Sequence, residues 1–174
     1  ETDSEWVMAF PDKDAFFLKD GIRRMDARLW MHYNAVCVTP AMAGISPGVG
    51  SDYGIMGMDS KHQPLDGAKT YKLHLPPNVP VKDDWSVVIY DPQTRSMLQT
   101  DQPRAGMNSI SGEIKANEDG SYDLYFAPKA PKGKNINWIQ TIPGKSWLIL
   151  LRMYGPLEPW LNKTWRPSEL ELMK

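Results

Sequence analysis

Turn signals made of proline, glycine and aspartate divide the second half of the chain into short apolar segments. Residues 71–75 are followed by two prolines, and residues 85–90 are followed by an Asp-Pro pair. Both segments have the length of a strand, and proline is typical of strand ends because it has no N–H to donate within a sheet. Short strands at near-regular spacing favour a β-sandwich or a barrel over a parallel sheet covered by helices.

Two hairpins are predicted further along the chain. An Asp-Gly turn at residues 119–120 predicts that residues 112–115 pair with residues 122–126. A Pro-Gly turn at residues 143–144 predicts that residues 137–141 pair with residues 147–154. In that last strand, alternate side chains share a face, so one face carries Trp147, Ile149, Leu151 and Met153, and the other carries Leu148, Leu150, Arg152 and Tyr154.

The N-terminal part of the chain has a different pattern. Apolar residues recur at helical spacing and predict one amphipathic helix over residues 14–33; they are Leu18, Ile22, Met25 and Leu29. Residues 39–57 are rich in glycine, alanine, serine and proline, which predicts a long loop. We therefore expect an N-terminal helix and connecting loop over residues 1–57, followed by a β-sandwich domain over residues 58–174.

Charge and length exclude several classes of protein. Among the 174 residues, 20 are basic and 21 are acidic, so no basic excess exists for binding nucleic acid. The longest apolar stretch, residues 147–151, is far shorter than the roughly 18 residues that a membrane span needs. The single cysteine, Cys37, cannot form an internal disulfide and is expected to pack as a small buried thiol. The three histidines lack metal-binding spacing, and we expect neither a metal nor another cofactor.

No catalytic set is evident from the motifs. Residues 44–48, Gly-Ile-Ser-Pro-Gly, match the nucleophile elbow of hydrolases. The residue after the serine is Pro47, which lacks the N–H that an oxyanion hole requires, so the match predicts a loop. Acidic clusters leave paired carboxylates open for acid-base chemistry, because no spacing in the sequence sets their separation.

Four residues are candidates for binding a ligand: His74, Trp138, Arg152 and Tyr154. His74 lies on the strand face opposite its leucine neighbours, and it would need a partner if that face were covered; a structural role is favoured over a functional one. Arg152 beside Tyr154 could clamp a carboxylate or phosphate, or could pair with an internal aspartate such as Asp91, and the internal pair is favoured. Trp138 could line a groove for a sugar or an apolar ligand, or could fill the core, and core packing is favoured.

Seven short motifs between residues 65 and 167 together resemble a bacterial family of domains of unknown function, family twelve-fourteen (DUF1214). They are residues 65–67 with 70–76, 85–91 with 94–96, 117–121, 127–128, 137–141, 152–156 and 164–167. The resemblance implies a jelly-roll-like antiparallel β-sandwich and supplies no catalytic residues. It also implies that the domain commonly follows a second uncharacterised domain, family twelve-fifty-four, often in exported proteins.

Three functions follow as expectations. The first is an exported, periplasmic or secreted module for binding or assembly, which forms homo-oligomers and holds a small-molecule or carbohydrate ligand near Trp138, Arg152 and Tyr154. The second is a hydrolase or lyase that uses carboxylates and His74 in a cleft of the sandwich. The third is a fragment of a larger protein, whose site is shared with a missing N-terminal domain.

Overall fold

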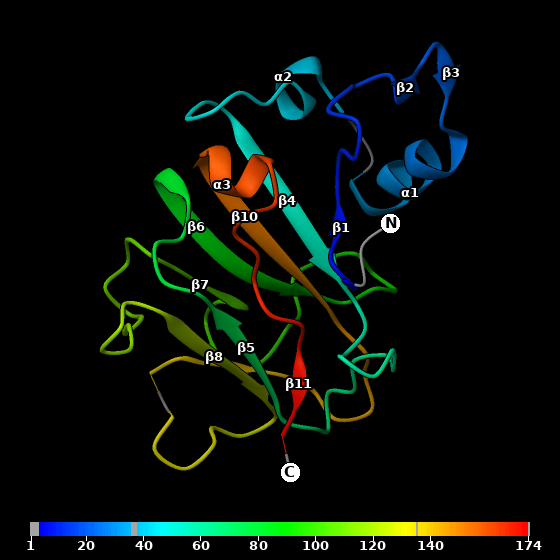
Figure 1. Ribbon diagram of the computed structural model, residues 1–174. Helices are drawn as coiled ribbons and strands as arrows, with labels where there is room; N and C mark the ends of the chain where they lie inside the picture. Colours follow the sequence, from blue (N-terminus) through cyan, green and yellow to red (C-terminus); the bar gives the residue numbers. More distant parts are fainter. Residues whose placement is uncertain (1–3, 36–37, 135, 174) are drawn as a thin grey trace.

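The computed structural model describes residues 4–35, 38–134 and 136–173 and is mainly β (Figure 1). One sheet is wholly antiparallel and has the order β1-β4-β10-β6-β7, with β1 at Val7–Met8, β4 at Ser51–Met56, β10 at Leu148–Pro156, β6 at Val81–Tyr90 and β7 at Gly106–Asn108. The other has the order β11-β5-β8-β9, with β11 at Glu171–Leu172, β5 at Tyr71–Leu75, β8 at Tyr122–Ala127 and β9 at Trp138–Gln140. The mainly β, antiparallel architecture is confirmed, except that β8 and β9 are parallel.

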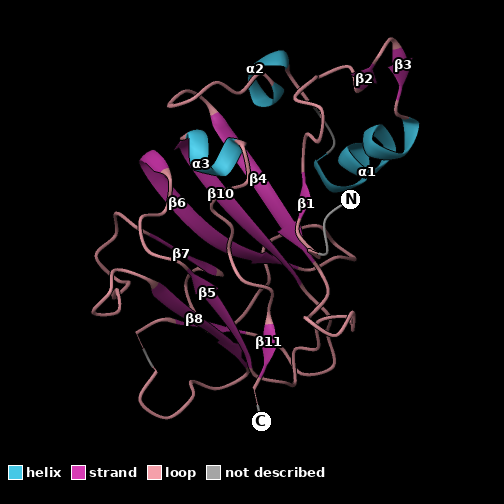
Figure 2. Ribbon diagram, in the orientation of Figure 1, coloured by secondary structure: helices cyan, strands magenta, loops and turns pink. Residues whose placement is uncertain are grey.

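The two sheets, whose strands are magenta in Figure 2, enclose one apolar core. Trp147 joins them, because its ring lies 5.0 Å from that of Phe126 and 5.8 Å from that of Tyr71, both in the second sheet. The predicted alternation in the last long strand is confirmed, with Ile149 and Leu151 fully buried and the intervening side chains part-exposed. The N-terminal segment covers part of the outer face of the five-stranded sheet, where Tyr53 and Ile55 pack against a second, smaller apolar cluster that includes Phe10 and Met31.

Both predicted hairpins are wrong in their pairing. Residues 112–115 form no strand, and β8 pairs with β5, where Leu73 lies opposite Leu124. β9 pairs with β8, whereas β10 pairs with β4 and β6 in the other sheet. The Pro-Gly turn at residues 143–144 thus connects the two sheets. A turn signal marks where a strand ends, but burial of the core decides which strand becomes its partner.

The predicted N-terminal helix is wrong over its first half. Asp20 and Gly21 both have left-handed φ angles, 52° and 77°, which form a tight turn between strands β2 (Leu18–Lys19) and β3 (Ile22–Arg23). Helix α1, Met25–Ala35, begins only after this hairpin. The expected apolar stripe is exposed, at 72% for Ile22 and 64% for Leu29, and the helix instead buries Met31.

The predicted loop over residues 39–57 is wrong near both of its ends. Residues 40–43 form the short helix α2, Pro40–Ala43, and Val49 closes a turn onto the carbonyl of Ser46. β4 then pairs with β10 in the five-stranded sheet. The division of the chain between residues 57 and 58 stays a prediction about domains. Cys37 lies outside the described residues.

After β10, the chain forms the short helix α3, Glu158–Leu161, and returns to the second sheet as β11. None of the described helices is both long and apolar enough to cross a membrane.

Candidate functional site

Arg152 occupies the outer face of the five-stranded sheet. In register it lies between Tyr53 of β4 and Ser86 of β6. Its Nη2 donates a hydrogen bond to the Tyr90 hydroxyl at 2.5 Å. Its Nε is buried and has no hydrogen-bond partner among the described residues. One donor of a partly buried guanidinium is thus left unsatisfied by the part of the chain that the structure describes.

The expected internal pair between Arg152 and Asp91 is wrong. Asp91 instead accepts a hydrogen bond from Lys145 Nζ at 2.5 Å and further bonds from backbone N–H groups. The backbone bonds stabilise the turn that follows β6, and the bond from Lys145 joins this turn to a neighbouring loop. In the described part of the chain, Arg152 forms no ion pair with a carboxylate.

Three tyrosines surround the guanidinium. Burial acts to lower the pKa of Arg152, but the phenols of Tyr154, Tyr90 and Tyr53 together raise that pKa above its ordinary value. Arg152 is therefore charged at every physiological pH. A phenol can accept from the guanidinium and donate its own proton onward. An anion at this place could therefore bind to a positive charge and to hydroxyl donors together.

An apolar cavity of about 330 Å³ lies on one side of Arg152, between the sheet and the N-terminal segment. Its walls are largely apolar and include Phe10, Trp30, Met31, Ile55 and Leu150. Figure 1 shows the N-terminal segment, with α1 and the β2-β3 hairpin, at the β1 edge of this sheet. The N-terminal part of the chain therefore supplies one wall of the cavity.

A groove of about 690 Å³, with both polar and apolar lining, also borders Arg152. It follows β6 and β7, and Asp84, Ser86, Asn108 and Tyr154 contribute polar groups to it. Arg152 lines both the groove and the apolar cavity. A cation at such a boundary suits a ligand with an apolar body and an anionic group.

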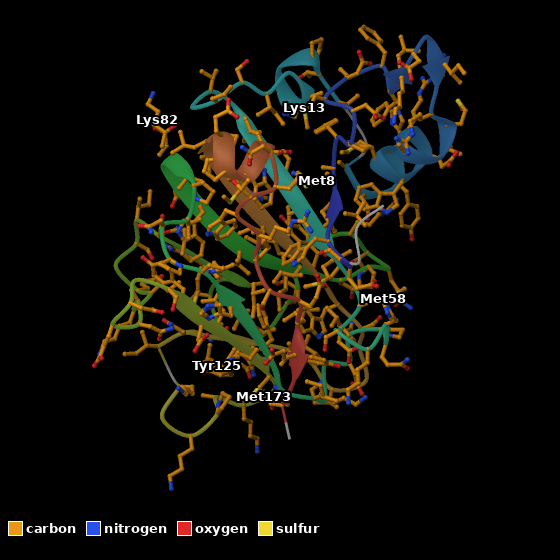
Figure 3. All side chains as sticks on the ribbon, in the orientation of Figure 1. Met8, Lys13, Met58, Lys82, Tyr125 and Met173 are labelled. Carbon is orange, nitrogen blue, oxygen red and sulfur yellow. The ribbon has the colours of Figure 1, made fainter. Side chains whose placement is uncertain are left out.

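His74 lies on the outer face of the four-stranded sheet. Directly opposite it on β8 is Asp123, whose Oδ1 is 2.8 Å from His74 Nδ1. Both residues line a polar groove of about 680 Å³, together with Tyr125, which Figure 3 labels. A carboxylate on one ring nitrogen orients the imidazole and leaves the other nitrogen for proton transfer. This pair could act in acid-base chemistry.

The four candidate residues therefore fall into two groups. Arg152 and Tyr154 lie together on the outer face of one sheet, and His74 and Trp138 lie on the outer face of the other. The Trp138 indole donates to the carbonyl of Ala127 at 2.9 Å, which fixes it against its own sheet. The structure does not bring Trp138 to Arg152.

Sequence reasoning missed Tyr53, Tyr90 and the N-terminal wall of the cavity. Tyr53 belongs to β4, where buried and part-exposed side chains alternate. The sequence shows no such signal, because the buried positions are occupied by Asp52, Gly54 and Met56, and the surrounding glycines favoured a loop. In the described part of the chain, no group of three or more His, Cys, Asp or Glu side chains could hold a metal ion.

Comparison with known proteins finds a family model and solved structures that resemble this chain. A family model described as a protein of unknown function (DUF1214) matches residues 50–158. A crystal structure of a Vibrio parahaemolyticus protein is 24% identical with a TM-score of 0.64, and the match covers 93% of this chain and 40% of that chain. A structure of an uncharacterized Burkholderia cenocepacia protein is 17% identical with a TM-score of 0.43, over 74% of this chain and 30% of that chain. The chain spans two-fifths or less of the length of these structures, and no curated protein matches it.

Proposed function

This chain belongs to the DUF1214 family of proteins of unknown function, and we propose that it is a binding module for a small apolar molecule that carries a carboxylate. The observation that supports this proposal is Arg152, which borders both an apolar cavity and a groove of mixed lining, and whose buried Nε has no hydrogen-bond partner among the described residues. The proposed function is non-enzymatic.

The energetic reason lies in the cost of a buried cation. A partly buried guanidinium with an unsatisfied donor loses hydration that the described protein groups do not fully replace. A carboxylate can accept from Nε and from a terminal nitrogen at once, which is the strongest common pairing of arginine. The Tyr53 and Tyr90 hydroxyls, which line the cavity, can add further donors, and the apolar body of the ligand would occupy the cavity.

Titration calorimetry with octanoate and octanol tests this proposal, since the two share an apolar chain and differ in charge. We expect octanoate to bind far more tightly, and Arg152→Lys to weaken octanoate binding by about 10- to 100-fold, because the bidentate bond is lost. Lys19→Gln, which changes an exposed charge on β2, serves as the matched control. Equal binding of the two ligands, or unchanged octanoate binding in a folded Arg152→Lys variant, would contradict the proposal.

A second candidate function rests on the His74–Asp123 pair. We propose as the alternative that this pair provides a general base for a hydrolase or lyase that acts on a polar substrate in the groove beside it. A panel of chromogenic esters and glycosides would detect turnover. We expect His74→Ala to abolish that turnover while the melting temperature stays nearly unchanged. A large loss of stability in this variant would assign His74 to structure instead.

We also propose that this binding module assembles into homo-oligomers. The N-terminal segment exposes several large apolar side chains, among them Phe16 at 64% and Ile22 at 72%. Large apolar side chains exposed together in one segment are a feature of contact surfaces. We propose that homo-oligomers form through this surface, with a separate N-terminal domain of the same protein as the rival occupant. In native mass spectrometry we expect Ile22→Thr with Leu29→Ser to dissociate the oligomer; a wild-type monomer would contradict self-assembly.

Export to the periplasm or the medium is also proposed. Expression of the full natural reading frame in a Gram-negative host, followed by fractionation, tests it. We expect the protein in the periplasmic or extracellular fraction, and retention in the cytoplasm would contradict export.

A further inference from the structure

A second cavity, lined by three tryptophans, lies between the N-terminal segment and the chain that follows α3. Its volume is about 160 Å³. Trp6, Trp160 and Trp165 supply its aromatic walls, and the remaining lining includes Lys163 and Arg166. Figure 3 labels Met8, which also lines this cavity. The cavity is distinct from the one at Arg152, because the two share no lining residue.

The indole N–H groups of this cavity are already used by the protein. Trp6 and Trp165 donate to backbone carbonyl oxygens at 2.9 and 3.2 Å. Trp160 donates to the buried carboxylate of Asp52 at 2.8 Å. These bonds fix the rings before any ligand arrives. The tryptophans therefore offer apolar ring surface to a ligand and no free hydrogen-bond donor.

Gly54 sets the position of two of these rings. A Cβ at this core-facing position of β4 would lie 3.1 Å from Trp6 and 3.3 Å from Trp160, closer than ordinary packing. The absence of a side chain lets both indoles approach the strand. The aromatic walls are thus held by the sheet itself.

The charged residues that line the cavity are basic. Lys163 Nζ lies 4.9 Å from the centre of the Trp160 ring and 3.4 Å from Met8 Sδ, and no ion pair joins it to a carboxylate in the described part of the chain. Burial lowers the pKa of Lys163, and Lys13 and Arg166 lower it further, against the opposite effect of the Asp52 charge. The ammonium is therefore poorly hydrated, and an anion beside it would restore a favourable partner.

We propose that this cavity binds a small carboxylate with a single six-membered ring. The volume supports one ring, since a cavity of about 150 Å³ in another protein takes up benzene. Fixed indoles favour ring stacking over a flexible chain. The ammonium of Lys163 selects the acid over neutral analogues, and the guanidinium of Arg166 adds a second positive charge to the lining.

Benzoate and benzyl alcohol are suitable probes, because they share the ring and differ in charge. The measurements are titration calorimetry and NMR of the tryptophan indole N–H resonances in the intact chain. We expect benzoate to shift the resonances of Trp6, Trp160 and Trp165 and to leave Trp30, which lines the cavity at Arg152, unshifted. Benzyl alcohol is expected to bind at least about ten-fold more weakly.

Lys163→Gln removes the charge from a part-exposed side chain, and we expect it to weaken benzoate binding at least about ten-fold. Lys19→Gln is the matched control and should bind benzoate as the wild type does. Equal binding of benzoate and benzyl alcohol would overturn the proposal. So would unchanged benzoate binding in Lys163→Gln, or a shift confined to Trp30, which would place the ligand at Arg152.

Discussion

At the scale of single residues, two buried aspartates show how the environment decides the behaviour of a side chain. Burial raises the pKa of Asp52, although the Trp160 indole and a backbone N–H partly oppose this effect. The hydrogen bond from Lys145 lowers the pKa of Asp91, and backbone N–H groups lower it further. Asp52 therefore opposes folding more as the pH rises, whereas Asp91 supports folding once it is ionised.

Asp91→Asn should change the pH dependence of stability. Because the folded pKa of Asp91 lies below the ordinary value of about 3.9, its contribution is complete above that value and is lost as the pH falls through the folded pKa. Urea unfolding should show the wild type more stable than the variant at about pH 6, and the difference should shrink below about pH 4. Exposed Asp83→Asn is the control, and a difference that stays constant across this range would contradict the role of the charge.

Gly67→Ala should destabilise the protein. A Cβ at Gly67 would lie 2.1 Å from the backbone oxygen of Ile142 and 2.8 Å from that of Lys145, and a backbone cannot yield as a flexible side chain can. We expect a loss of about 3 kcal/mol in the free energy of unfolding. Gly57→Ala, which meets no atom within 4 Å, should change it by less than about 0.5 kcal/mol. Similar losses in the two variants would contradict the close approach.

At the scale of elements, the chain shows local turn chemistry overriding a periodic pattern. The apolar spacing from Leu18 to Leu29 is helical, yet the Asp-Gly turn at residues 20–21 divides it into a hairpin and a helix. Two residues with left-handed φ fit this turn and are incompatible with a continuous helix. The apolar stripe then belongs to two elements and faces outward.

A pair of substitutions in α1 tests which face is buried. Met31 is 4% exposed and packs with Phe10 and Phe17, whereas Leu29 is 64% exposed. Met31→Ala should lower the free energy of unfolding by about 2 to 4 kcal/mol. Leu29→Ala should change it by less than about 0.5 kcal/mol. Denaturant unfolding of both variants measures this contrast. A larger loss of stability in Leu29→Ala than in Met31→Ala would show that the face predicted from the apolar spacing is the buried one.

At the scale of the whole molecule, the packing of the two sheets places the candidate sites on separate faces. Inward side chains of both sheets fill the core, so Arg152 and His74 lie on outer faces that point away from each other. The N-terminal segment adds a wall to one of these faces and a tryptophan to the separate cavity. The segment expected to connect domains thus takes part in the sandwich.

Two truncated chains test where the folded unit begins. A chain of residues 58–174 lacks β4, which leaves the edge of β10 unpaired and uncovers the core. We expect no cooperative thermal transition from it in circular dichroism. A chain of residues 50–174 keeps β4 and should unfold cooperatively, below the wild-type melting temperature, because Trp6 and Phe10 are lost. A sharp transition in the shorter chain would support the boundary after residue 57.

The sequence alone determined the class of fold and the ends of several strands. Pro76, Pro92 and Pro128 each follow a strand, because proline cannot continue a ladder of hydrogen bonds. The alternation from Trp147 to Tyr154 determined which side chains of that strand enter the core. Both patterns involve residues that are close in the sequence, so they can be interpreted without knowing which strand is the partner.

Tertiary structure alone decided the pairing and the sites. Which strand lies beside β9 or β10 depends on how both sheets bury their apolar faces together, and that contact joins residues distant in the sequence. Arg152 bonds to Tyr90, whereas the next residue, Asp91, bonds to Lys145. Tyr90 is the last residue of β6, and Asp91 already belongs to the turn that follows it. Neighbouring residues at the end of a strand can therefore have entirely different partners. The cavities depend on the N-terminal segment folding back over the sheet edge, a long-range event that no local pattern specifies.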